Sequence, residues 1–142
     1  MHLIQIAIMV QSIVKIFESL SDEQSVKLFT TIATGESTNT LELRTRVPLT
    51  RKQYYSRLSR MIGAGLVKRK GGKLVLTAFG KIVYESLKIV EAANSIQWKL
   101  KALDSVDASE ELPKEERRKL LDNLIENEFI KEILSEEYLG HK

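Results

Sequence analysis

In this 142-residue chain, the basic residues are the ones whose type and spacing indicate a chemical function. Between Arg44 and Lys81 there are 11 basic residues and no acidic residue, whereas the rest of the chain holds 11 bases and 19 acids. The formal net charge of +3 therefore conceals a segment of +11 beside a remainder of −8. Such a segment attracts a polyanion or an anionic membrane.

Residues for catalysis or metal binding are scarce by comparison. The chain has no cysteine, and its two histidines, His2 and His141, lie at opposite ends. Thiolate zinc sites, thiol catalysis and a Ser-His-Asp arrangement therefore lack their raw material. No glycine-rich loop of the phosphate-binding kinds occurs. We expect no enzyme activity, no metal site and no cofactor.

The amino-terminal segment predicts a packing helix over residues 1–21. Its apolar residues recur at alternating intervals of three and four, as in a heptad seam: Leu3, Ile6, Val10, Ile13, Phe17 and Leu20. The seam fits either the core of the same subunit or a dimer. The uncharged run from Leu3 to Val14 would rise only about 18 Å as a helix, short of a bilayer's hydrocarbon core. We expect no membrane span, no targeting signal and a cytoplasmic location.

Capping residues and glycines predict two further helices before a turn. Ser21 is a candidate N-cap for a helix over 22–34, which Gly35 ends. A short helix should begin at about Thr40. Pro48 cannot continue that helix because its ring fixes φ and it donates no amide hydrogen, so a tight turn follows.

Thr50 predicts the start of the most informative helix, because Gln53 stands three residues later as in a capping box. One side of this helix is apolar and should face the core: Tyr54, Tyr55, Leu58, Met61 and Ile62. The opposite side carries Lys52, Gln53, Ser56 and Arg60, with Arg57 and Ser59 on the flanks. Gly63 and Gly65 should end the helix.

A β-hairpin is predicted next. Two β-favouring runs flank Gly71-Gly72, a pair that can adopt the positive φ values of a two-residue turn. The hairpin tip carries four positive charges: Lys68, Arg69, Lys70 and Lys73.

The remainder of the chain predicts two long helices. The first should run from Ala78 to about Leu103, with a heptad repeat of Ile82, Ser86, Ile89, Ala93, Ile96, Leu100 and Leu103. Its distal half needs a partner, either another subunit or the chain's own terminal helices. An irregular acidic segment is expected over Asp104–Leu112. The last helix should then cover residues 114–138, with Pro113 at its first turn.

This order of elements resembles a known family. The run TLELRTRVPLTRKQYYSRLSRMIGAGLVKRKGGKLVLTAFG is similar to a winged helix-turn-helix domain, as in small archaeal regulators related to the ArsR and MarR groups. The resemblance covers roughly residues 22–85. It implies a mainly α fold with a small β-hairpin, organised as an N-terminal helix (1–21), a DNA-binding domain (22–77) and dimerisation helices (78–142). The missing cysteines argue against an ArsR-type metal sensor.

The resemblance implies a homodimeric transcription regulator that binds specific double-stranded DNA. An α-helix fits the major groove of B-DNA, where basic and amide side chains reach base edges. The expected DNA-binding residues are Thr50, Arg51, Lys52, Gln53, Ser56, Arg57 and Arg60 on the recognition helix, and Lys68, Arg69, Lys70 and Lys73 on the wing. The expected dimer interface comprises Val10, Ile13, Phe17, Ile82, Ile89, Ala93, Ile96, Leu100 and Leu103.

Two other classes of function stay open at this point. A winged-helix adaptor would hold another protein and bind no specific DNA, with the basic surface meeting an acidic partner. An RNA-binding protein or an enzyme is the third class. Single-strand binding would need aromatic side chains exposed on the basic surface, and Tyr54 and Tyr55 should instead face the core.

Overall fold

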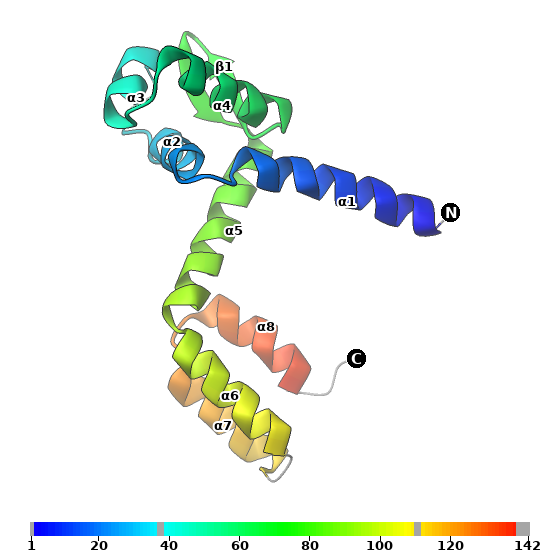
Figure 1. The fold of residues 1–142 in the computed structure, drawn as a ribbon. Helices are drawn as coiled ribbons and strands as arrows, with labels where there is room; N and C mark the ends of the chain where they lie inside the picture. The colour runs from blue at the N-terminus through cyan, green and yellow to red at the C-terminus, as the bar shows by residue number, and fades with distance from the viewer. Residues whose placement is uncertain (1, 37–38, 110–111, 139–142) are drawn as a thin grey trace. The chain divides into compact units, whose positions relative to one another are not determined.

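The computed structural model describes residues 2–36, 39–109 and 112–138, which form eight helices and one two-stranded antiparallel hairpin (Figure 1). The prediction of a mainly α fold with a small hairpin is therefore confirmed. The chain divides into two compact units, Met1–Tyr84 and Glu85–Lys142. The boundary between these two units lies inside one helix.

The first unit contains four helices, the hairpin and the beginning of a fifth helix. The helices are α1 (His2–Ser19), α2 (Glu23–Thr34), α3 (Thr40–Arg46) and α4 (Arg51–Gly63), and the strands are β1 (Val67–Lys70) and β2 (Lys73–Leu76). The core is formed by buried side chains from all of these except α1: Leu28, Phe29, Ile32, Leu43, Val47, Tyr54, Leu58, Met61, Leu66, Val67, Leu74 and Leu76.

Local chemistry explains where these elements begin and end. Asp22, not Ser21, caps α2, because its side chain accepts a hydrogen bond from the Ser25 amide. The Ser21 hydroxyl instead donates to the Glu18 carbonyl at the end of α1. At the hairpin turn, Gly71 and Gly72 have φ values of +58° and +77°, as a two-residue turn requires.

The second unit contains the rest of α5 (Ala78–Ser95), then α6 (Gln97–Ser109), α7 (Lys114–Leu124) and α8 (Glu128–Tyr138). Its core consists of Leu103, Leu121, Ile125 and Ile130. The prediction of one helix from Ala78 to Leu103 is wrong, since the helix is interrupted at Ile96. There the Ile96 amide bonds the Ala93 carbonyl three residues back, and the Ser95 hydroxyl bonds the Ala92 carbonyl.

Two further predictions for this part of the chain are also wrong. The segment after Asp104 is not irregular throughout, because α6 continues to Ser109. The last helix is divided in two, because Ile125 is extended (φ −106°, ψ 118°) and Asn127 starts a new helix. The Asn127 side chain accepts a hydrogen bond from the Ile130 amide, which makes it the cap of α8.

Candidate nucleic-acid interface

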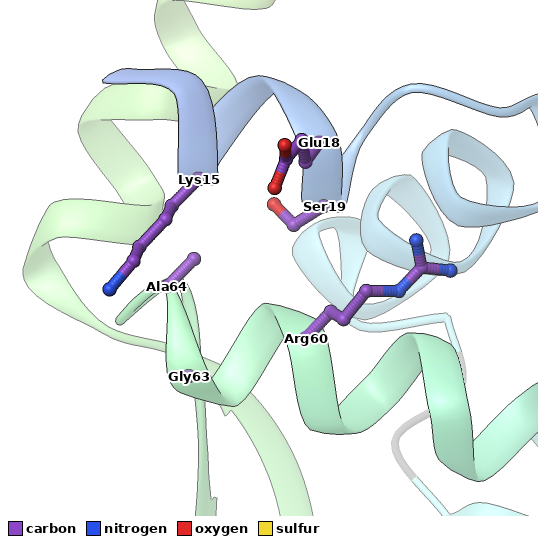
Figure 2. A pocket seen from close by; sticks show the side chains of 6 residues that line it. All are labelled: Lys15, Glu18, Ser19, Arg60, Gly63 and Ala64. Atoms are coloured by element: carbon purple, nitrogen blue, oxygen red, sulfur yellow. The ribbon is translucent and has the colours of Figure 1, made fainter. Parts of the chain in front are cut away.

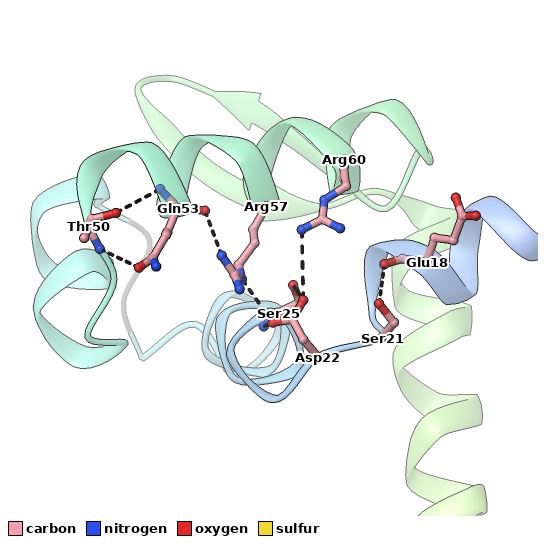
Figure 3. A network of polar contacts seen from close by, with 8 residues as sticks. All are labelled: Glu18, Ser21, Asp22, Ser25, Thr50, Gln53, Arg57 and Arg60. Carbon is pink, nitrogen blue, oxygen red and sulfur yellow. Dashed lines mark hydrogen bonds and ion pairs between the residues drawn. The ribbon is translucent and has the colours of Figure 1, made fainter.

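Helix α4 is fixed at its start by the turn and cap that the sequence predicts. Thr50 and Gln53 form a capping box: the Gln53 amide donates to Thr50 Oγ1 (3.2 Å) and the Thr50 amide donates to Gln53 Oε1 (3.1 Å) (Figure 3). Tyr54, Leu58 and Met61 are buried and hold the helix against the core. The prediction of the cap is confirmed, and so is burial of these three side chains. Tyr55 and Ile62, which were expected on the same buried side, are instead 40% and 39% exposed.

The outer surface of α4 carries most of the side chains that we expected there. Arg51, Lys52, Gln53, Ser56 and Arg60 are exposed, and Thr50 is exposed at the helix start. Ser59 is exposed as well, three residues after Ser56. Since Ser56 and Ser59 are small, they leave the helix backbone accessible to a ligand surface.

The Gln53 side chain is already engaged. Its carbonyl oxygen accepts the Thr50 amide in the capping box. A bidentate contact with adenine uses both the carbonyl and the amino group of the side chain. The contact that we expected for Gln53 would therefore require this bond to break, so Lys52 and Ser56 are better placed to reach a ligand.

An aspartate from outside the basic segment contacts this helix. Asp22 Oδ1 accepts from Arg57 Nε at 3.0 Å, and Asp22 Oδ2 lies 4.0 Å from Arg60 Nη2 (Figure 3). The Arg57 side chain is only 19% exposed. Arg57 Nη1 also donates to the backbone carbonyl of Gln53 at 3.3 Å. The structure thus places Arg57 between α2 and α4, where its first role is to join two helices.

The pKa of Asp22 records this contact. Partial burial acts to raise the pKa, but the amide and hydroxyl of Ser25 and the guanidinium of Arg57 outweigh it and hold the pKa at about 2. Asp22 is therefore ionised at neutral pH and offsets positive charge beside Arg57 and Arg60. Arg46 is paired similarly, with Glu36 at 3.1 Å. The segment without acids in the sequence is therefore partly neutralised in space.

The cations of the hairpin divide between its two faces. The register pairs Lys68 with Val75, Arg69 with Leu74 and Lys70 with Lys73. Because side chains alternate along a strand, Lys68, Lys70 and Lys73 share one face, and Arg69 lies on the other with the buried Leu74. Burial raises the pKa of the Tyr54 phenol of α4, and Arg69 lies close enough to offset part of that rise. The four expected wing cations thus do not form one uniform surface.

The carboxyl end of α1 contacts the carboxyl end of α4. Lys15, Glu18 and Ser19 of α1 and Arg60, Gly63 and Ala64 line a cavity of about 230 Å³ between them. Figure 2 shows the Glu18 and Ser19 side chains on the α1 side and Arg60 on the α4 side. The position of α1 is thereby linked to the helix that carries the candidate DNA-binding residues.

The expected dimer residues fall into two groups. In the second unit, Leu103 is buried, and Ile89, Ala93, Ile96 and Leu100 pack around it within the same chain. Two partners were considered for this repeat, another subunit and the chain's own terminal helices. The structure shows the repeat packed against the chain's own helices. Ile82 is exposed on α5, before this core begins.

The apolar side chains of α1 have a different environment. Val10, Ile13 and Phe17 are exposed, and only Ser19 is buried in the whole helix. By length and composition alone α1 could also cross a membrane, a criterion that core helices and signal sequences meet as well. The first unit thus leaves its largely apolar helix α1 uncovered.

Comparisons with known proteins do not identify the chain. No protein-family model matches it, and neither the curated proteins nor the solved structures searched contain a similar chain. Within the described ranges, no group of three or more histidine, aspartate or glutamate side chains is arranged to hold a metal ion.

Three residues of the candidate interface were missed by sequence reasoning. Asp22 lies 35 residues from Arg57, and Ser21 was expected in place of Asp22 as the helix cap. Tyr55 was expected in the core, but it is 40% exposed and stacks edge-on against Tyr54 at 5.0 Å. Ser59 was placed on a flank, and its exposure follows from the exact rotation of α4, which the sequence does not define.

Proposed function

We propose that this protein binds specific double-stranded DNA as a homodimer and regulates transcription. In this proposal the first unit is a winged helix-turn-helix domain of the kind found in small archaeal regulators. Helix α4 enters the major groove and the hairpin contacts the adjacent backbone or minor groove. The observation that carries the proposal is the exposed, acid-free outer surface of α4, held in place by its buried side.

Charge supports the proposal at the level of the structural units. Residues 1–84 hold 13 bases and 5 acids, whereas residues 85–142 hold 9 bases and 14 acids. A net +8 therefore belongs to the unit that carries α4 and the hairpin, and a net −5 to the other. A polyanion would be attracted to the first unit and repelled by the second.

Geometry assigns different tasks to the side chains. Lys52 and Ser56 face outward from the first two turns of α4, where a recognition helix contacts base edges. Arg51 and the amides at the start of the helix suit a phosphate, because a helix amino terminus favours negative charge. Lys68, Lys70 and Lys73 suit phosphates as well, and such contacts position a protein more than they select a sequence.

The experiment is a selection of duplexes from a random library, followed by binding measurements on the selected and on scrambled duplexes. Lys52→Ala should lower the ratio of specific to non-specific affinity by about tenfold, since one base contact contributes about 1–3 kcal/mol. Lys73→Ala should weaken both duplexes about equally. Lys119→Ala removes the same charge from α7 and is the matched control, with no expected effect. Failure to enrich any sequence would contradict specific recognition.

The alternative is a protein-interaction adaptor, and the exposed apolar helix α1 is the observation that favours it. An adaptor would hold a different protein through α1 and would bind no duplex at moderate salt. The same selection separates the two proposals, because an adaptor enriches no DNA sequence while forming a stable complex with another protein.

A further inference from the structure

A second group of cations surrounds a cavity away from the outer surface of α4. The cavity has a volume of about 350 Å³ and lies between the end of α2, the hairpin and the first turn of α5. Lys68 and Lys70 of β1 and Lys81 of α5 contribute to its lining. Volumes of about 300–1,000 Å³ are typical of sites for small molecules.

The electrostatics of this cavity favour an anion. Three lysines are among its lining residues, and no carboxylate is among them in the described part of the chain. Glu36 follows the lining residue Gly35, but its carboxylate is paired with Arg46 at 3.1 Å. The three ammonium groups repel one another. A bound anion would offset this repulsion, because it attracts all three.

The cavity is also lined by apolar residues. Among these, Ile32 and Leu76 are buried and Val75 is half-buried. An inorganic ion would leave this apolar surface in contact with water. A ligand with both an anionic group and an apolar body would cover the surface and meet the lysines at once.

We propose that this cavity binds a small organic anion with an apolar body. Lys68, Lys70 and Lys81 hold its phosphate or carboxylate group, and Ile32, Val75 and Leu76 contact its apolar part. Lys68 and Lys70 also belong to the hairpin face proposed to contact DNA. A ligand in the cavity would engage these two lysines and so keep them from DNA phosphates. This regulatory part of the inference rests on the proposed function.

The test of binding uses the full-length chain with isotope-labelled Ile, Leu and Val methyl groups and phenyl phosphate as the probe. We expect saturable shifts of the Ile32, Val75 and Leu76 methyl resonances. Inorganic phosphate should bind at least about tenfold more weakly, because it lacks the apolar body. The absence of saturable shifts, or equal affinity for inorganic phosphate, would overturn the proposal.

Variants locate the probe. Lys81→Ala should weaken phenyl phosphate by about tenfold, the loss expected for one charge-assisted hydrogen bond. Lys73→Ala is the matched control, because it removes the same charge from the same hairpin face without lining the cavity. The affinity of Lys73→Ala for phenyl phosphate should stay within about twofold of that of the unsubstituted protein. An equal loss in both variants would show general attraction to positive charge and would contradict a site.

The regulatory part has its own measurement. At about three times its dissociation constant, phenyl phosphate should weaken duplex binding by the unsubstituted protein about fourfold, and it should weaken binding by Lys81→Ala by less than about 1.5-fold at the same concentration. Unchanged duplex affinity would contradict the regulation alone. If the protein binds no duplex even at low salt, the proposed function fails, while the methyl shifts still decide whether the cavity is a binding site.

Discussion

Asp22 shows how one residue serves both the fold and the candidate interface. It caps α2 through Ser25, joins α2 to α4 through Arg57, and places a negative charge 4.0 Å from Arg60. A side chain with these roles should contribute to stability mainly through its charged form. The arginines beside it are correspondingly less available to a phosphate than Lys52 or Arg51.

Asp22→Asn should destabilise the protein by about 1 kcal/mol at pH 7. Asparagine caps a helix as well as aspartate does, so the loss comes from the charged contacts. The lowered pKa sets an upper bound of roughly 2.5 kcal/mol, which solvent screening of this partly exposed group reduces. Urea unfolding followed by circular dichroism measures the difference. Glu23→Gln, at the neighbouring exposed carboxylate, is the control and should change stability much less than Asp22→Asn does.

The pH dependence of this effect has a defined sign. Because folding lowers the pKa of Asp22 from 3.8 to about 2, its contribution is fully present above about pH 4. The contribution is lost as the pH falls from about 4 through 2, because the carboxyl is protonated in both states only below the folded-state pKa. The stability difference between the natural protein and Asp22→Asn should therefore shrink over this range. A difference that stays constant down to pH 2 would contradict the assigned role.

At the scale of elements, a close backbone contact holds α5 against the loop before the hairpin. A Cβ added to Gly80 would lie 2.0 Å from the Leu66 carbonyl oxygen, so only glycine fits there. The Thr77 amide donates to that same carbonyl at 3.0 Å. This contact fixes the start of α5 beside the hairpin and so shapes the lysine-lined cavity.

Gly80→Ala should therefore destabilise the first unit by about 3 kcal/mol, as forced overpacking against backbone does. Gly63→Ala provides the matched control in α4, because nothing lies within 4 Å of an added Cβ there. That variant should be neutral or more stable by up to about 1 kcal/mol, given the helix propensity of alanine. Thermal unfolding of the two variants measures both effects, and equal melting temperatures would contradict the packing argument.

Sequence patterns predicted elements wherever local chemistry decides them. The capping box at Thr50, the turn at Pro48 and the Gly71-Gly72 hairpin all depend on residues close in the chain. The interruptions at Ile96 and Ile125 were not predicted, because the heptad repeat continues through Ile96 and no proline or glycine marks Ile125. Asn94, Ser95 and Asn127 gave a weak signal, since their side chains compete with helical hydrogen bonds. The contact of Asp22 with Arg57 depends on tertiary packing and left no local pattern.

At the scale of the whole molecule, α1 is an apolar element that the rest of the first unit leaves uncovered. Its apolar side chains include Phe17, which is 66% exposed. A helix of 18 residues with this surface suits pairing with the same helix of a second subunit. Since α1 contacts the end of α4, such pairing would also set the separation of two recognition helices.

Light scattering tests the dimer. The natural protein should have twice the 16.2 kDa mass of one chain, and Phe17→Glu should be a monomer at micromolar concentration because it buries a charge in the proposed seam. Ser12→Glu, which adds the same charge outside the heptad seam of α1, is the control and should remain a dimer. A monomeric natural protein would contradict pairing through α1.

The salt dependence of duplex binding tests the central claim most directly. If a dimer neutralises about 6–8 phosphates, the logarithm of its affinity for DNA should fall with the logarithm of salt concentration with a slope of roughly −5 to −7. The molecule also carries negative charge, at Asp22, at Glu36 and in the second unit. A steep slope therefore indicates that the basic surface of the first unit faces the DNA. A slope near zero, or no duplex binding at low salt, would contradict the account.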